Sequence, residues 1–298
     1  MTLNRGRLYV VAAAALWSLS GVLAKTIELP GPTMACLRAL FAAAVLLPLL
    51  RPRLISIRPA MLGMVVCFTT MNVCYVTAIT KTTAANAIFL QYTAPAWMFL
   101  ASVLWLREPF DRRSLQSLAL SMMGVAVIVA GNWSGASVGI VLGLVAGLAF
   151  GGVAVFLRLL REENSVWLTV LNHSVAGLVL LPFVLSQTEL HPRHATSTQL
   201  AALAIFGAVQ MALPYILFSR GLSVVSAQEA GVVALLEPTL NPLLTYLAVG
   251  EVPTASTLAG GAIILAAVAW RYLRPGLDRA TATETESGGR VAANEPSG

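Results

Sequence analysis

Apolar runs long enough to cross a lipid bilayer recur along this chain. A helix needs about 20 predominantly apolar residues to span roughly 30 Å of hydrocarbon, and it satisfies its own backbone hydrogen bonds. Connections rich in proline and charge separate the runs, as at residues 28–32 and 51–53. The sequence therefore predicts an all-α integral membrane protein of about ten transmembrane helices. The expected spans are 7–26, 33–51, 60–80, 84–106, 115–132, 137–158, 166–185, 198–219, 226–249 and 254–273.

Composition and motifs exclude several other classes of protein. Hydrophobic residues make up 57% of the chain, charged residues make up 11%, and the mean hydropathy is +0.79. Soluble domains carry about 25% charged residues, so the natural solvent of this chain is lipid. Its 19 Lys and Arg residues lie in short clusters between apolar runs, which is not the pattern of a nucleic-acid-binding face. No G-x-x-x-x-G-K-[ST] sequence occurs, which excludes ATP-driven transport within this chain.

The cations predict the orientation, because short cytoplasmic loops retain Lys and Arg. A cytoplasmic N-terminus puts most arginines inside, and the opposite side receives little beyond Lys25, Lys81 and Arg193. The same rule puts the C-terminus inside, which requires an even number of spans. The first run is about twenty residues long, which suits a retained helix in the cell inner (plasma) membrane better than a cleaved signal peptide. Residues 275–298 are expected to form a disordered cytoplasmic tail.

An internal repeat divides the chain into two similar halves. Segment 84–108 can be laid over segment 227–251 with the same spacing of Ala, Pro and Glu. Five helices is an odd number, so the second half enters the membrane from the opposite side. We expect inverted repeats at residues 1–132 and 133–274 around a central cavity. Such halves can open a central site to each side in turn, as in secondary transporters.

Three segments carry a resemblance to a known family: Ala15-Leu16-Trp17-Ser18 to Lys25, Phe89-Leu90-Gln91-Tyr92-Thr93-Ala94-Pro95 to Glu108, and Leu235-Leu236-Glu237-Pro238 to Glu251. On these residues the chain resembles the drug/metabolite transporter superfamily, specifically its EamA type, over nearly all its length to about Arg274. The resemblance implies a bundle of two inverted five-helix repeats that exports amino acids or related small metabolites. Members differ widely in substrate, so the resemblance does not supply a ligand.

Glu237 lies near the middle of the ninth run, where an unpaired carboxylate costs several kcal/mol. We predict that it faces the cavity and either binds a substrate ammonium group or takes up a proton. A carboxyl group satisfied by a neighbouring helix is the structural alternative. Pro95, Pro238 and Pro242 each remove a helical hydrogen bond, so they are candidates for hinges or for static kinks.

Other polar and aromatic residues within the runs are candidates for the cavity wall. Polar groups there can line a pathway, or they can hydrogen-bond one helix to another, which is the favoured use for each. Aromatic rings can accept flat or apolar substrate side chains, or they can serve packing alone. The candidate substrate-binding residues are Glu237, Trp17, Tyr75, Gln91, Tyr92, Asn72, Tyr215 and His173.

Lys25 and Arg38 lie near the outer ends of the first two spans, where long side chains can reach the interface. We interpret Arg38 as such an interfacial cation. Lys25 matches a basic position common in the family, so the resemblance also implies a role in gating or in binding an anionic group. The gating candidates are Lys25, Pro95, Pro238 and Pro242.

The predicted function is secondary export of small metabolites, with amino acids as the favoured substrates, driven by a proton or by the solute's own gradient. The expected partners are a small-molecule substrate and membrane lipid, without cofactor, metal or nucleic acid. G-x-x-x-G patterns at residues 143–151 predict close helix contact, within a monomer or in a weak homodimer.

An intramembrane lipid-modifying enzyme is one alternative to a transporter, but its acidic candidates at 108–111 and 162–163 lie among arginines in short loops. A non-transporting scaffold is the other.

Overall fold

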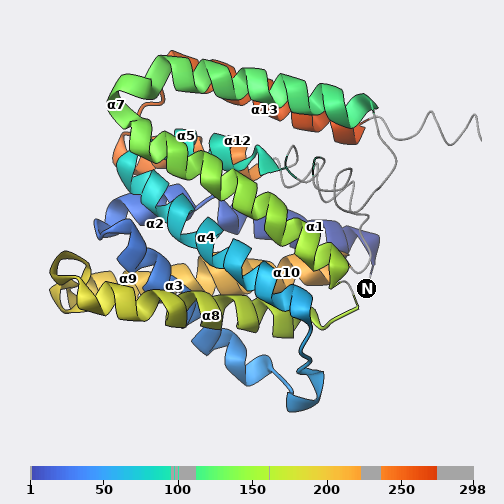
Figure 1. Ribbon diagram of the computed structural model, residues 1–298, viewed down its shortest axis with the longest axis vertical. Helices are drawn as coiled ribbons and strands as arrows, with labels where there is room; N and C mark the ends of the chain where they lie inside the picture. The colour runs from blue at the N-terminus through green and yellow to red at the C-terminus, as the bar shows by residue number, and fades with distance from the viewer. Residues whose placement is uncertain are drawn as a thin grey trace, which may run out of the picture.

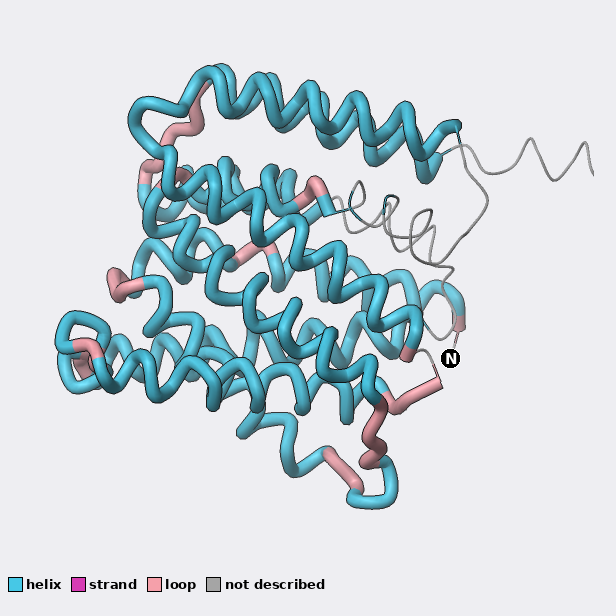
Figure 2. Tube along the Cα trace, viewed as in Figure 1, coloured by secondary structure: helices cyan, strands magenta, loops and turns pink. Residues whose placement is uncertain are grey.

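The computed structural model describes residues 2–94, 97, 100, 112–160, 162–222 and 236–273, and its regular elements there are all helical (Figures 1 and 2). The prediction of an all-α protein is confirmed for these residues. The α-helices are α1 (Leu3–Trp17), α2 (Ser20–Ile27), α3 (Gly31–Leu46), α4 (Pro59–Lys81), α5 (Ala84–Gln91), α7 (Arg112–Leu159), α8 (Ser165–Ser186), α9 (Ser197–Ile205), α10 (Leu213–Leu222), α12 (Leu236–Val249) and α13 (Ala255–Leu273). A π-helix, η5 (Phe206–Ala212), joins α9 to α10, and 3-10 turns lie at η1 (Leu47–Leu49), η2 (Pro52–Leu54), η3 (Thr188–Leu190) and η4 (Pro192–His194).

Six helical segments within the described residues are long and apolar enough to cross a membrane. Two further apolar helices, Leu115–Gly131 and Ala255–Ala267, are shorter. The predicted spans 84–106 and 226–249 extend into residues outside the described part, so the count of ten stays a prediction. The six segments are Asn4–Ile27, Gly31–Leu49, Pro59–Lys81, Val138–Leu157, Ser165–Ser186 and Ser197–Phe218.

The predicted spans 115–132 and 137–158 belong to one helical element. The chain stays helical throughout α7, without the expected loop between the two spans. Figure 1 shows two limbs of α7 that run in opposite directions, the first beside α13 and the second beside α4. The chain therefore reverses its direction inside α7, which supplies two passes through the bundle.

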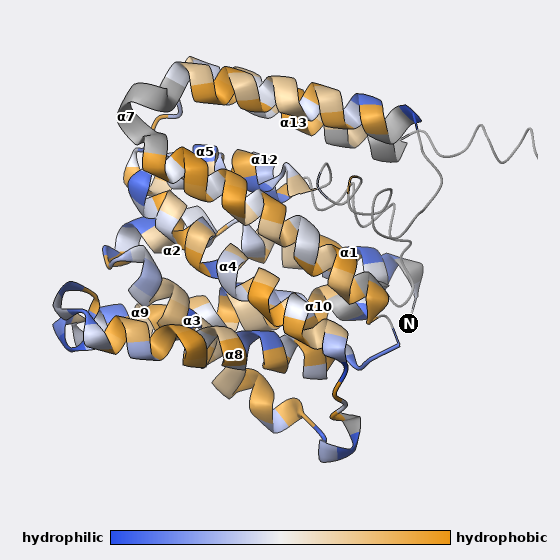
Figure 3. Ribbon diagram, in the orientation of Figure 1, coloured by the Kyte–Doolittle hydropathy of each residue, from blue (hydrophilic) through white to orange (hydrophobic). Residues whose placement is uncertain are grey.

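Apolar side chains cover the outside of the bundle as well as its core. Leu62 is 70% exposed and Leu247 is 69% exposed, and hydrophobic residues run along the visible helices in Figure 3. A surface of this kind suits lipid rather than water. The start of α1 and the end of α13 lie at the same end of the bundle, as an even number of crossings requires (Figure 1).

Two of the departures from regular α-helical geometry in the described part of the chain meet. The first span is broken between α1 and α2, and the span from α9 to α10 contains the π-helix η5. Gln210 of η5 donates from Nε2 to the carbonyl oxygen of Trp17, the last residue of α1, over 3.2 Å. Irregular backbone at membrane depth is tolerated where neighbouring protein groups satisfy it, and it often marks a functional site.

Glycines allow two pairs of helices to approach closely. A Cβ atom on Gly147 of α7 would lie 2.6 Å from the carbonyl oxygen of Leu90 in α5, so the helix contact predicted from the G-x-x-x-G patterns is confirmed there. This contact lies within the chain. A Cβ atom on Gly260 of α13 would lie 2.4 Å from the carbonyl oxygen of Gly124 in α7, and the reciprocal distance is 2.6 Å.

The Gly124–Gly260 contact can be tested by adding bulk. We expect Gly260→Val to lower the unfolding temperature of the detergent-solubilised protein by several degrees, because α7 and α13 must separate and overpacking costs about 1–3 kcal/mol. The matched control is Ala259→Val, since Ala259 is the exposed neighbour on the same helix. Equal unfolding temperatures for the two variants would contradict the close approach.

Candidate functional site

A chain of hydrogen-bonded polar side chains crosses the interior from α4 through α2 to α12. The hydroxyl oxygens of Tyr75 and Ser20 lie 2.8 Å apart, and Asn241 donates from Nδ2 to Ser20 Oγ over 2.7 Å. All three side chains are buried. Ser20 is the first residue of α2, so the chain of bonds ties both neighbouring helices to the point where the first span is broken.

Glu237 lies beside this polar chain. It is one helical turn from Asn241 on α12, so the two side chains share a face. Tyr92, directly after α5, donates its hydroxyl to Glu237 Oε2 over 3.0 Å. Glu237 is half-buried, and its second oxygen has no hydrogen-bond partner among the described residues. The structure thus places Tyr92 on the Glu237 carboxylate, connects Tyr75 to the same region through Ser20 and Asn241, and leaves one carboxylate oxygen that can accept from a ligand.

An aromatic cluster joins four helices. The Trp17 ring centroid lies 5.4 Å from that of Tyr215 and 5.2 Å from that of Phe218. The His173 ring lies 5.6 Å from Tyr215 and 4.8 Å from Phe68. The predicted residues Trp17, Tyr215 and His173 therefore form one group, which can serve packing or provide a wall for a flat or apolar ligand.

Arg38 is the site residue that we misinterpreted from the sequence. It does not reach the interface, because it is 2% exposed and lies inside the bundle. Its Nε and Nη2 both donate to Asn72 Oδ1, over 3.0 and 2.6 Å, and its guanidinium carbon lies 4.9 Å from the centroid of the Phe206 ring. Asn72 in turn donates to the carbonyl oxygen of Ala35, which fixes the amide so that its oxygen faces the guanidinium. Asn72 therefore makes the expected interhelical contact.

Several buried polar atoms in the described chain have no hydrogen-bond partner. In native proteins such atoms are few, and each requires a reason, such as a bound water, ion or ligand. Most of them belong to residues of the polar chain and the aromatic cluster or to their immediate neighbours. They are Arg38 Nη1, Thr77 Oγ1, Asn172 Oδ1, His173 Nε2, Gln210 Oε1 and Asn241 Oδ1.

Lys25 belongs to a polar network at one end of the bundle. Its Nζ lies 2.6 Å from Glu251 Oε2 and donates to the carbonyl oxygen of Thr82 over 2.8 Å. The other carboxylate oxygen of Glu251 accepts from the backbone N–H of Ala84, the first residue of α5, over 2.6 Å. The network joins α2, the connection from α4 to α5, and the loop before α13. Lys25 is therefore held by partners within the protein, and a gating role for it stays a prediction.

The other predicted residues are placed without a defined role. Gln91 is buried at the end of α5, and Pro238 and Pro242 are buried in α12. Pro95 lies outside the described residues. A hinge function for these prolines stays a prediction. The described residues contain no group of His, Cys, Asp or Glu side chains that could hold a metal ion.

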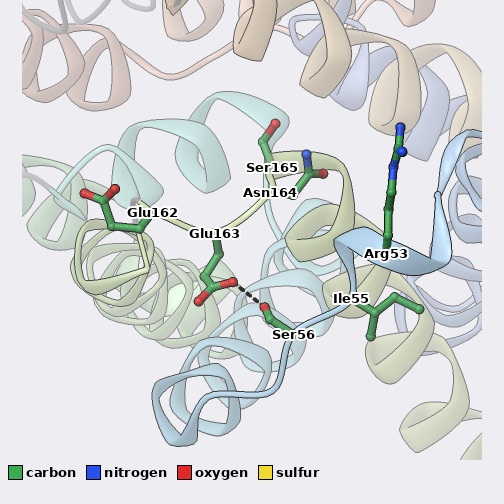
Figure 4. A pocket seen from close by; sticks show the side chains of 7 residues that line it. All are labelled: Arg53, Ile55, Ser56, Glu162, Glu163, Asn164 and Ser165. Atoms are coloured by element: carbon green, nitrogen blue, oxygen red, sulfur yellow. Dashed lines mark hydrogen bonds between the residues drawn. The ribbon is translucent and has the colours of Figure 1, made fainter.

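Of the two acidic pairs considered for an enzyme, the one at 108–111 lies outside the described residues and the one at 162–163 lies in the loop before α8. Figure 4 shows an open depression of about 650 Å³ lined by Arg53, Ile55, Ser56, Glu162, Glu163, Asn164 and Ser165. Glu163 accepts hydrogen bonds from Ser56 Oγ and, over 2.9 Å, from Arg58 Nε. These donors hold the pKa of the Glu163 carboxyl below its usual range. A carboxylate held charged in this way is a poor general acid, and Glu163 pairs with Arg58 of a neighbouring loop.

The fold and its interior define a class of protein: a helical membrane protein whose apolar exterior surrounds buried polar side chains, as a transporter requires. The EamA-like transporter family matches the sequence twice, over residues 4–130 and 137–273. The chain therefore belongs to the EamA-like transporter family and is a membrane transporter.

Individual relatives agree with this assignment. An uncharacterized transporter of Archaeoglobus fulgidus is 34% identical over 66% of this chain and 71% of the relative. The pseudopaline exporter CntI of Pseudomonas aeruginosa is 30% identical over 65% of this chain and 68% of the relative. The uncharacterized inner membrane transporter YicL of Salmonella typhimurium is 26% identical over 89% of this chain and 94% of its own. A solved crystal structure with 15% identity matches 93% of this chain and all of its own with a TM-score of 0.67, so the two share a fold.

The network around Lys25 predicts a measurable coupling energy. Lys25 and Glu251 are 24% and 17% exposed, so their charges are little screened. In a double-mutant cycle of Lys25→Met and Glu251→Gln, we expect a coupling of about 1–3 kcal/mol in the free energy of unfolding.

The control is a second cycle, with Arg58→Met and Glu163→Gln, in which Glu163 is 12% exposed but Arg58 is 65% exposed and screened by water. Exposed ion pairs contribute less than about 1 kcal/mol. Chemical unfolding in detergent micelles measures both cycles. A Lys25–Glu251 coupling no larger than that of the control pair would mean that the network does not hold this end of the bundle together.

Proposed function

We propose that this protein is a secondary transporter that exports small metabolites, with amino acids as the favoured class, from the cytoplasm across the inner membrane. The observation that carries the proposal is the half-buried carboxylate of Glu237, which Tyr92 holds beside the polar chain of the interior. A carboxylate at membrane depth is costly unless it acts on a charged partner. The ammonium group of an amino acid is such a partner.

Alternating access is the mechanism that suits this arrangement. The two family matches support two repeats, for which we keep the boundaries 1–132 and 133–274, and we propose that the second is inverted. With the N-terminus in the cytoplasm, the network of Lys25, Glu251, Thr82 and Ala84 lies at the outer end. Its contacts would close that end while the site is open to the cytoplasm, and their separation would release substrate outward.

The direction and the driving force follow from separate considerations. Export is supported by the Pseudomonas aeruginosa relative, whose name describes it as an exporter. Glu237 provides a group that can carry a proton when it is not neutralised by substrate, so exchange of a proton for a cationic group is a consistent coupling scheme. The solute's own gradient is the alternative driving force.

Flux through reconstituted protein tests the proposal. In proteoliposomes we expect the wild-type protein to move radiolabelled amino acids and an imposed pH gradient to change the rate. Glu237→Gln keeps the size of the side chain and an acceptor for Tyr92 but removes the charge. We expect it to lower the rate about 10–100-fold, because a hydrogen bond to a charged group contributes about 1.5–3 kcal/mol.

Glu163→Gln is the matched control, because it removes a carboxylate from the loop depression and leaves the interior unchanged. Its flux should equal that of the wild type. A wild-type protein that moves no amino acid would remove this substrate class. Normal flux in Glu237→Gln would make Glu237 a structural carboxyl group.

A further inference from the structure

Arg38 carries a positive charge that is buried inside the bundle. Among the described residues it forms no ion pair, and its hydrogen-bonding side-chain partner is the neutral amide of Asn72. Burying an ion costs several kcal/mol. At this buried site the cation–π contact with Phe206 contributes about 2 kcal/mol, and the contact with Asn72 adds a similar amount. A structural arginine at this depth would be expected to have a carboxylate partner.

The unused part of the guanidinium group has the shape of a carboxylate receptor. Asn72 occupies the Nε–Nη2 edge, and Nη1 is buried without a partner. The remaining edge, formed by Nη1 and Nη2, presents two parallel N–H donors, and this geometry binds a carboxylate through both of its oxygens. The contact between Asn72 and the Ala35 carbonyl holds the acceptor in place, so the free edge is oriented before a ligand arrives.

Arg38 and Glu237 act on the same region of the interior. Asn72 and Tyr75 are three residues apart on one face of α4, and hydrogen bonds continue from Tyr75 through Ser20 to Asn241, one turn from Glu237. The buried cation and the half-buried carboxylate therefore lie at the two ends of one polar chain, and the two do not form an ion pair with each other.

We propose that Arg38 binds the carboxylate of a zwitterionic substrate whose ammonium group is bound by Glu237, with the side chain of the substrate against Trp17 and Tyr215. This inference rests on the proposed transport function, and it specifies the substrate class as molecules that carry both charges. One ligand would then neutralise both interior charges at once. Neither an amine nor a carboxylic acid alone could do so.

The test uses three ligands of nearly equal size: L-phenylalanine, its decarboxylated analogue phenethylamine, and its deaminated analogue 3-phenylpropionate. Binding to detergent-solubilised protein is measured by the shift in unfolding temperature and by quenching of tryptophan fluorescence. We expect the wild-type protein to bind L-phenylalanine at least 10-fold more tightly than either analogue. This comparison needs no variant, so it holds even if changes at Arg38 prevent folding.

Two variants then assign the charges. Arg38→Met should weaken binding of L-phenylalanine about 10–100-fold and leave phenethylamine unchanged, because only a carboxylate contact is lost. Glu237→Gln should weaken L-phenylalanine and phenethylamine and leave 3-phenylpropionate unchanged. This crossed pattern separates ligand contacts from general destabilisation, which would weaken all three ligands alike.

The outcomes also separate this inference from the proposed function. If the wild-type protein binds phenethylamine as tightly as L-phenylalanine, or if Arg38→Met binds L-phenylalanine normally, the role of Arg38 is overturned while amino-acid export stands. If the wild-type protein binds none of the three ligands and moves no amino acid in the flux experiment, the proposed function itself falls.

Discussion

The requirement that buried polar groups find partners without water shapes this structure more than any other constraint. In a membrane the apolar surface gains little by turning inward, so the exterior stays apolar and the interior becomes the place for polar side chains. The broken first span illustrates the requirement, because the carbonyl oxygen of Trp17 is satisfied by Gln210 from the π-helix. Where the described residues do not meet the requirement, as at Asn241 Oδ1, His173 Nε2 and Gln210 Oε1, most of the unmet groups lie in or beside the polar chain and the aromatic cluster. A bound polar substrate would provide hydrogen-bond partners for these groups.

The spans could be predicted because hydropathy is a local property. The predicted runs 60–80 and 166–185 agree with α4 and α8 to within a few residues, since ends defined by proline and charge are visible in the sequence. The break before Ser20 and the π-helix could not be predicted. No proline or glycine marks Ser18 or Leu19. In η5, Gly207 packs against α3, since a Cβ atom there would lie 2.6 Å from the carbonyl oxygen of Arg38, and a contact between segments so distant in sequence is not visible in a local pattern.

The site was predictable in part, for a similar reason. Glu237 was identified because a carboxylate in an apolar run is anomalous wherever the helix lies, whereas its contact with Tyr92 is visible only in the structure. Arg38 was assigned to the interface because it appeared near the end of a span. It lies about two turns into α3, under η5 and against α4, and its burial depends on helices that are distant in sequence. The signal that could have found it is the pairing of a cation with Asn72, another polar residue inside an apolar run.

The two polar networks differ in a way that suits their proposed uses. The interior chain is buried and crosses three helices, so disrupting it would leave several groups unpaired at once. The network of Lys25 and Glu251 is partly exposed and can exchange its partners for water, so opening it costs a few kcal/mol at most. A substrate shifts a conformational equilibrium by no more than its difference in affinity for the two states, and about 5.5 kcal/mol is enough to reverse a ratio of about 100 to 1. The binding of a doubly charged ligand can therefore supply enough free energy to open the network of Lys25 and Glu251. A fully buried ion pair at the same position would hold the protein in a single state.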